Sequence, residues 1–119
     1  MFRVTKVYSD DAGESHFADV EIELFDGGSI GLLSNPQAAK TVVFREVLPF
    51  YDWDFHCAPE RQYIILLDGE IEIETSRGEK RRFKGGDILL MEDITGRGHK
   101  TKNIIPSVRK SVFITLPDE

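Results

Sequence analysis

Alternation of apolar and polar residues runs through much of this chain and constrains its fold more than any other feature. In residues 20–24 apolar side chains alternate with glutamates, and residues 70–74 repeat the pattern. A period of two places the apolar side chains on one face of a β-strand. Dipeptides such as Asp26-Gly27 and Asp68-Gly69 separate these segments and are typical of turns. The pattern predicts an all-β chain.

The alternation and the turn signals together give a set of short, closely spaced strands, which is typical of a sandwich or barrel. One helical turn is expected at residues 35–40, with Asn35 as its cap and Pro36 at its first position. We expect a single domain over residues 1–119, with a core barrel over about 40–116. The expected strands are residues 2–8, 17–25, 29–33, 41–48, 53–57, 62–67, 70–75, 80–83, 87–91, 98–104 and 108–116.

Composition narrows the classes of partner. The net charge of −6 argues against nucleic acid or an anionic membrane surface as partner. The longest apolar run, residues 63–67, has the length of a strand and is far too short to cross a bilayer. No secretory signal is evident, and a single cysteine, Cys57, cannot form an intramolecular disulfide. We therefore expect a cytoplasmic protein with no nucleic-acid and no membrane partner.

Two segments carry more than a strand signal. Residues 53–70 read Trp-Asp-Phe-His-Cys-Ala-Pro-Glu-Arg-Gln-Tyr-Ile-Ile-Leu-Leu-Asp-Gly-Glu, with His56 six residues before Gln62 and Gln62 seven before Gly69. Residues 86–103 open on Gly-Asp, contain a Gly-Arg-Gly-His sequence that ends at His99, and close on Asn103.

Together these segments resemble the two motifs of the cupin superfamily in order, spacing and strand context. The resemblance covers roughly residues 40–115. It implies the cupin double-stranded β-helix, a jelly-roll barrel in which His56, Gln62 and His99 converge on one interior site. Short single-domain cupins commonly pair, so the resemblance also favours a homodimer. The N-terminal strand supports this expectation. It has apolar residues on both faces, Phe2 and Val4 on one and Val7 on the other, and a partner sheet could cover the second face.

The chain differs from the family motifs at two of the positions that supply metal ligands. A typical cupin metal site uses three histidines and one glutamate, but here Ala58 and Gln62 occupy the positions of the second histidine and the glutamate. His56, Gln62 and His99 remain as a metal set, and we expect at most a weakly bound divalent transition metal. Asp54 has the strand parity of His56, so it could be a third ligand or could orient the imidazole.

Other residues are expected around this site. Ile64, Leu66 and Leu90 are expected to form an apolar lining, and Asp54, Trp53 and Thr101 to contact a ligand. Glu92 and Asp93 allow two interpretations. They could form a solvated turn in which Asp93 is a local cap, or they could supply an acid or base at the mouth of the barrel.

Three functions fit this pattern. The first is an isomerase, epimerase or lyase in which His56 or His99 removes a proton next to a carbonyl and Gln62 donates a hydrogen bond to the developing enolate. The second is a metal-dependent enzyme, such as an oxygenase, with a reduced ligand set. The third is a non-catalytic module that binds a small polar or carboxylate metabolite. In each case the partner is a small molecule.

Overall fold

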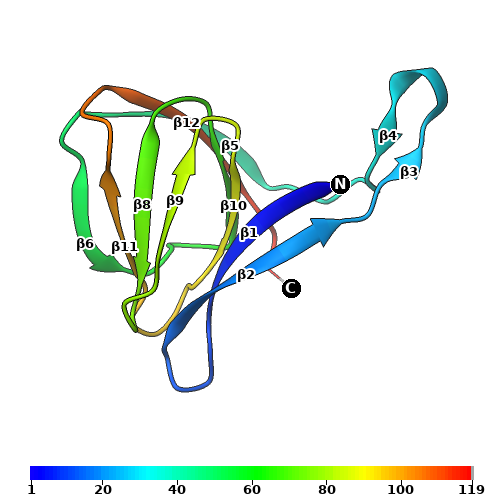
Figure 1. Cartoon of the computed structure of the whole chain (residues 1–119). Coiled ribbons are helices and arrows are strands. Elements are labelled where there is room, and N and C mark those ends of the chain that lie inside the picture. Colours follow the sequence, from blue (N-terminus) through cyan, green and yellow to red (C-terminus); the bar gives the residue numbers. More distant parts are fainter. Residues whose placement is uncertain (119) are drawn as a thin grey trace.

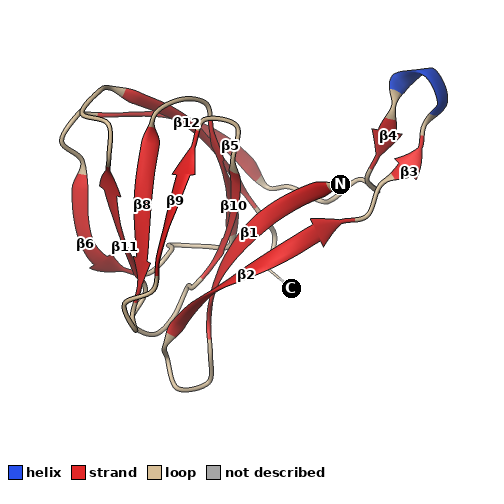
Figure 2. Cartoon of the chain, in the orientation of Figure 1, coloured by secondary structure: helices blue, strands red, loops and turns tan. Residues whose placement is uncertain are grey.

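The computed structural model describes residues 1–118 and is built almost wholly of β-strands (Figures 1 and 2). Two sheets face each other, and a small hairpin projects from the barrel that they form. The strands are β1 (Phe2–Ser9), β2 (Ser15–Ile22), β3 (Phe25–Asp26), β4 (Leu32–Leu33), β5 (Thr41–Val47), β6 (Asp52–His56), β7 (Gln62–Leu66), β8 (Glu70–Thr75), β9 (Lys80–Lys84), β10 (Ile88–Glu92), β11 (His99–Asn103) and β12 (Arg109–Thr115).

The larger sheet has the order β2-β1-β10-β7-β12-β5, and the smaller one the order β6-β11-β8-β9. The strand pairs of both sheets are antiparallel except for β1 with β10. Strands distant in sequence are therefore neighbours in space, as a jelly roll requires. The expectation of an all-β jelly-roll barrel is confirmed.

The core lies between the two sheets, because alternate side chains of both point inward. In β8, Ile71 and Ile73 are buried while the glutamates between them are not. From the larger sheet, Leu66 and Leu89 pack into the same cluster, and both are almost completely buried. In β8 the alternation read from the sequence thus decides which face forms the core.

The stretch between β2 and β5 differs from expectation. Strand β2 ends at Ile22, and residues 29–33 belong to a short hairpin, in which a 3₁₀ turn at Gly28–Ile30 links β3 to β4. No helical turn forms at residues 35–40. This segment instead runs across the outer face of the larger sheet, where the Tyr63 hydroxyl donates to Gln37 Oε1 at 2.7 Å. A single helical turn is unstable by itself, so the segment adopts the extended course that packs it on the apolar outer face of the sheet.

The N-terminal strand is covered within the chain itself. Strand β1 lies between β2 and β10, with Val7 in the core and Val4 3% exposed. The argument that β1 needs a partner chain is therefore wrong, although Phe2 stays partly exposed. Within the described residues, no helix is long and apolar enough to cross a membrane.

Candidate functional site

Strands β6 and β11 bring the two motif histidines together. These strands are antiparallel neighbours in which His56 pairs directly with His99, and the two ring centroids lie 4.6 Å apart. The register then shifts, because Thr101 pairs with Trp53 and not with Asp54. One extra residue on β6 therefore forms a β-bulge between the histidine pair and the next pair.

The bulge changes which side chains of β6 face inward. Trp53 stacks on His56 with ring centroids 3.8 Å apart, although the two residues are three positions apart. Regular alternation would have placed Asp54 beside His56. Asp54 is instead exposed, and its Oδ1 accepts a hydrogen bond from Phe55 N at 2.8 Å. The parity argument that placed Asp54 at the site is wrong, because it assumed an unbroken strand.

The backbone of β6 fixes the tautomer of His56. Its Nδ1 donates to the carbonyl oxygen of Asp54 at 2.8 Å, so Nδ1 carries the proton and Nε2 keeps a free lone pair. Burial lowers the pKa of His56, and the neighbouring His99 adds to this effect. The hydrogen bond to the Asp54 carbonyl and the charge of Asp93 oppose it but do not cancel it. His56 is therefore a neutral base at neutral pH.

Asp93 plays the corresponding part for His99. Its side chain is completely buried, and Oδ2 accepts a hydrogen bond from Nδ1 of His99. The other carboxylate oxygen has no hydrogen-bond partner among the described residues. His99 thus also presents Nε2 as its free ring nitrogen. The interpretation of Asp93 as a cap in a solvated turn is wrong, because the loop folds this carboxylate inward behind the imidazole.

Both histidines line one cavity between the sheets, of about 370 Å³, which we call the central cavity. Its lining is mainly apolar, with a few polar groups, as is common for small-molecule sites. The lining residues are Arg45, Tyr51, Trp53, His56, Ala58, Pro59, Gln62, Ile64, Leu66, Ile71, Ile73, Leu89, Met91, His99, Thr101 and Phe113.

The cavity thus holds most of the residues that the sequence predicts for the site, namely His56, Gln62, His99, Ile64, Leu66, Trp53 and Thr101. Leu90 is not among its lining residues, because β10 turns Leu89 and Met91 inward. The run Ile-Leu-Leu-Met is apolar throughout, so the sequence holds no alternation from which the inward face could be read.

Sequence reasoning missed the wall formed by Arg45, Tyr51 and Phe113. The guanidinium carbon of Arg45 lies 4.4 Å from the centre of the Phe113 ring and 5.7 Å from that of Tyr51. Arg45 comes from β5, and Tyr51 from the loop before β6. Nothing in the motif segments points to β5, and only the pairing of β5 with β12 brings this arginine to the cavity.

Glu92 and Cys57 lie outside the central cavity. Glu92 accepts from Arg61 Nε at 2.7 Å and lies 3.7 Å from the Lys6 ammonium. The Cys57 thiol donates to the carbonyl oxygen of Gly96 at 3.2 Å. Both side chains contact residues outside the cavity, and neither contacts the histidine pair.

The donor groups do not fit a tight divalent metal centre. Two imidazole nitrogens and the amide of Gln62 are all neutral donors, and the Ala58 side chain offers none. No cluster of three or more His, Cys, Asp or Glu residues suited to a metal ion occurs within residues 1–118. Asp93, the carboxylate beside the histidine pair, already accepts from Nδ1 of His99.

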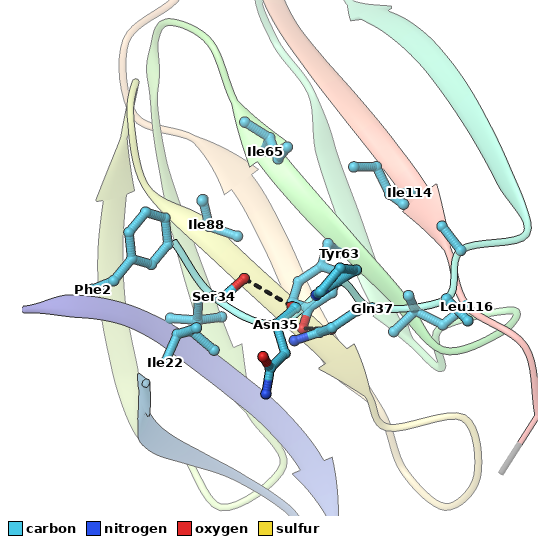
Figure 3. A pocket seen from close by; sticks show the side chains of 14 residues that line it. Phe2, Ile22, Ser34, Asn35, Gln37, Tyr63, Ile65, Ile88, Ile114 and Leu116 are labelled. Atoms are coloured by element: carbon cyan, nitrogen blue, oxygen red, sulfur yellow. Dashed lines mark hydrogen bonds between the residues drawn. The ribbon is translucent and has the colours of Figure 1, made fainter. Parts of the chain in front are cut away.

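A second cavity of about 310 Å³ lies on the outer face of the larger sheet (Figure 3). Phe2, Ile65, Ile88 and Ile114 point into it, and the segment with Gln37 runs along it. None of the described residues that line it is Asp, Glu, Lys, Arg or His, so it lacks the imidazole bases of the central cavity. The central cavity is therefore the candidate functional site.

The fold is that of a cupin domain, because two facing, mostly antiparallel sheets form a jelly-roll barrel with the histidine pair inside it. Comparison with solved structures agrees. The chain matches the Cnp3 cupin domain of Schizosaccharomyces pombe with a TM-score of 0.56 at 13% identity, over 99% of this chain and 89% of that one. The chain thus has the cupin fold.

A second similar structure is the putative ethanolamine utilization protein EutQ of Salmonella typhimurium. Its TM-score is 0.42 at 17% identity, over 100% of this chain and 98% of that one. No protein-family model and no curated protein matches the chain. The match to the Cnp3 cupin domain supports the fold alone, and any activity has to be argued from the central cavity.

Proposed function

We propose that the central cavity binds a small carbonyl compound and that His99 moves a proton at the carbon next to that carbonyl. One observation carries this proposal: His56 and His99 each have Nδ1 bound to an acceptor, which leaves Nε2 of each ring as the nitrogen available to a ligand. A base must be unprotonated and held in place to remove a carbon-bound proton. The apolar lining excludes water and strengthens every polar contact inside.

The step balances within the residues present. Nε2 of His99 takes the proton, and the electron pair of the broken C–H bond moves into the enolate. The imidazolium that forms is stabilised by Asp93, as the buried carboxylate of a Ser-His-Asp triad stabilises its histidine. The amide of Gln62 donates to the enolate oxygen. Return of the proton from His99 to carbon closes the cycle.

The positions of the bases favour isomerisation over epimerisation. His56 and His99 are directly paired neighbours, with ring centroids 4.6 Å apart, on one wall of the central cavity. A two-base epimerase needs its bases on opposite faces of the reacting carbon, because the proton leaves one face and arrives on the other. Two bases on one wall suit the isomerisation of an α-hydroxy carbonyl compound, in which the carbon-bound proton moves to the neighbouring carbon on the same face and the hydroxyl proton passes to the former carbonyl oxygen.

Deuterium exchange tests the proposal whatever the product of the reaction is. Small aldehydes, ketones and oxo acids are incubated with the protein in D₂O, and loss of the proton next to the carbonyl is followed by NMR. We expect exchange above the buffer rate for at least one compound class. His99→Gln should reduce it by roughly 10²–10⁴-fold, the usual contribution of a general base. Asp93→Asn should reduce it by up to ~10⁴-fold through loss of the orienting carboxylate.

His16→Gln is the matched control, because His16 is the third histidine of the chain and pairs with Asp10 outside the central cavity. Its exchange rate should equal that of the wild type. The proposal fails if no compound exchanges faster than in buffer, or if His99→Gln exchanges as fast as the wild type. Binding without exchange would favour a non-catalytic binding module, and metal-dependent exchange would favour a metal enzyme.

A further inference from the structure

The central cavity has a charged wall that the proton-transfer proposal does not use. Among the described residues that line it, Arg45 alone carries a permanent charge, and none is Asp, Glu or Lys. Asp93 lies behind His99 and is fully buried. A ligand in this cavity therefore meets a positive charge within an apolar, weakly screening wall.

Arg45 has no anionic partner in the described chain. Its Nε donates to the hydroxyl of Ser111 at 3.1 Å, and its guanidinium carbon lies over the rings of Tyr51 and Phe113. No ion pair forms between Arg45 and any of residues 1–118. Burial lowers the pKa of Arg45, and the side chain of Tyr51 opposes this shift without cancelling it.

The guanidinium of Arg109, which also lies near Tyr51, adds a second positive charge. Arg109 is 1% exposed, and its guanidinium carbon lies 5.6 Å from the centre of the Tyr51 ring. Nε donates to Asn103 Oδ1 at 2.9 Å, but both terminal nitrogens lack hydrogen-bond partners among the described residues. Burial and the charge of Arg45 lower the pKa of Arg109 to about 10, so it remains a cation at neutral pH. One half-buried and one buried cation near the same aromatic ring create a positive potential there.

A row of aromatic rings connects this charge to the two bases. The centres of the Tyr51 and Trp53 rings lie 6.5 Å apart, Trp53 stacks on His56, and His56 contacts His99. Arg45 and the histidine pair line the same cavity, so a ligand bound there is exposed to both groups. The cavity volume of about 370 Å³ suits a small metabolite.

We infer that the ligand of the central cavity is a small oxo acid whose carboxylate is bound by Arg45 and whose carbonyl end faces His56 and His99. This inference rests on the proposed function and names its substrate class. A carboxylate matches the guanidinium fork and carries a single charge, in keeping with one arginine in the cavity lining. A phosphate dianion would need further donors, and the described lining supplies no second cation.

Fluorescence of Trp53 offers a direct test, because it is the only tryptophan in the chain and lies in the cavity lining. Levulinate and pyruvate are titrated into the protein, alongside levulinamide as a matched neutral compound and inorganic phosphate as the other anion. We expect the oxo acids to give saturable changes in Trp53 emission. Levulinamide and phosphate should bind more weakly by roughly 10- to 100-fold, the scale of one charged hydrogen-bonded contact.

Three variants separate charge from folding. Arg45→Gln should weaken levulinate binding roughly 10- to 100-fold and leave levulinamide binding unchanged. Arg45→Lys keeps the charge without the fork and should fall between Arg45→Gln and the wild type. Arg77→Gln is the matched control, because Arg77 is exposed in the β8–β9 turn, and it should bind like the wild type. Circular dichroism confirms that each variant is folded. Should Arg45→Gln not fold, the wild-type preference for levulinate over levulinamide decides.

The inference is overturned if levulinate and levulinamide bind equally well, if a folded Arg45→Gln variant binds levulinate as the wild type does, or if neither oxo acid alters Trp53 emission at tens of millimolar. Its failure is separable from that of the proposed function. Deuterium exchange of neutral carbonyl compounds, together with equal binding of levulinate and levulinamide, would sustain proton transfer and reject the oxo acid. Arg45-dependent binding without exchange would sustain the ligand class and reject catalysis.

Discussion

At the scale of single residues, the chemistry proposed for the central cavity depends on which acceptor binds Nδ1 of each histidine. The backbone carbonyl of Asp54 fixes His56, and the buried carboxylate of Asp93 fixes His99. A carbonyl is a neutral acceptor, whereas the carboxylate brings a full negative charge. The two imidazoles therefore differ in the partner of Nδ1, and this difference is why the proposal gives proton transfer to His99, where Asp93 would stabilise an imidazolium formed during the reaction.

The lowered pKa of His56 predicts a dependence of stability on pH. The unfolded chain takes up this proton near the ordinary pKa of about 6.5, before the folded protein does. The stabilising contribution is therefore complete above about pH 6.5 and is lost as the pH falls through the lower folded pKa. Urea unfolding between pH 5 and 8 should show the wild type losing stability relative to His56→Gln on acidification. The opposite slope would contradict the direction of the shift.

Metal affinity is the second property decided by single residues. Ala58 and Gln62 are both buried in the cavity lining, so larger or charged side chains there would point at the histidine pair. The variant Ala58→His with Gln62→Glu should bind Ni²⁺ or Zn²⁺ orders of magnitude more tightly than the wild type, as titration calorimetry can measure. We expect little metal in wild-type protein purified without an affinity tag. Tight one-to-one binding by the wild type would instead favour a metal enzyme.

At the scale of elements, the end of β6 and the loop before β11 meet through a glycine. Gly98 has φ of +73°, and a Cβ there would lie 2.1 Å from the carbonyl oxygen of His56. The hydroxyl of Ser15 donates to the Gly98 carbonyl at 2.7 Å, which ties the same point to β2. Backbone therefore approaches backbone directly beside the histidine pair, and only a residue without a side chain permits it.

Gly98→Ala tests this contact, and Gly78→Ala is its matched control. Both glycines have positive φ, but a Cβ at Gly78 would meet nothing within 4 Å. We expect Gly78→Ala to cost about 1–2 kcal/mol from backbone strain alone. Gly98→Ala should cost about 2–6 kcal/mol, because strain and a backbone clash add. Denaturant unfolding gives both values, and equal costs for the two variants would show that the clash is relieved elsewhere.

At the scale of the whole molecule, the fold leaves two apolar surfaces without cover. Strand β5 is an edge of the larger sheet, and Phe44 on it is 81% exposed. The β3–β4 hairpin projects away from the barrel (Figure 1), and Ile30 and Leu32 in it are more than half exposed. Hairpins this short are not stable alone, and exposed apolar edge strands attract pairing.

We expect a homodimer in which a second copy covers the edge strand β5, and not β1. Light scattering at micromolar concentration should give the mass of two chains. Phe44→Glu should shift it toward one chain, because two charges would meet at a two-fold contact. Ile94→Glu, at a partly exposed apolar residue in the loop after β10, is the control and should leave the mass unchanged. A wild-type mass of one chain would refute the expectation.

The sequence by itself determined most of the strands, the inward faces of those that alternate, such as β8, and the pair of motif histidines, because alternation is a local property carried by the residues of a strand. The sequence could not reveal the bulge in β6, because the register of a strand is set by its neighbour. That bulge places Trp53 beside His56, where regular alternation would have placed Asp54. Nor could the sequence bring Asp93 behind His99, or Arg45 and Arg109 to Tyr51. Those placements join distant segments, and only the pairing of the sheets decides which distant side chains share a cavity.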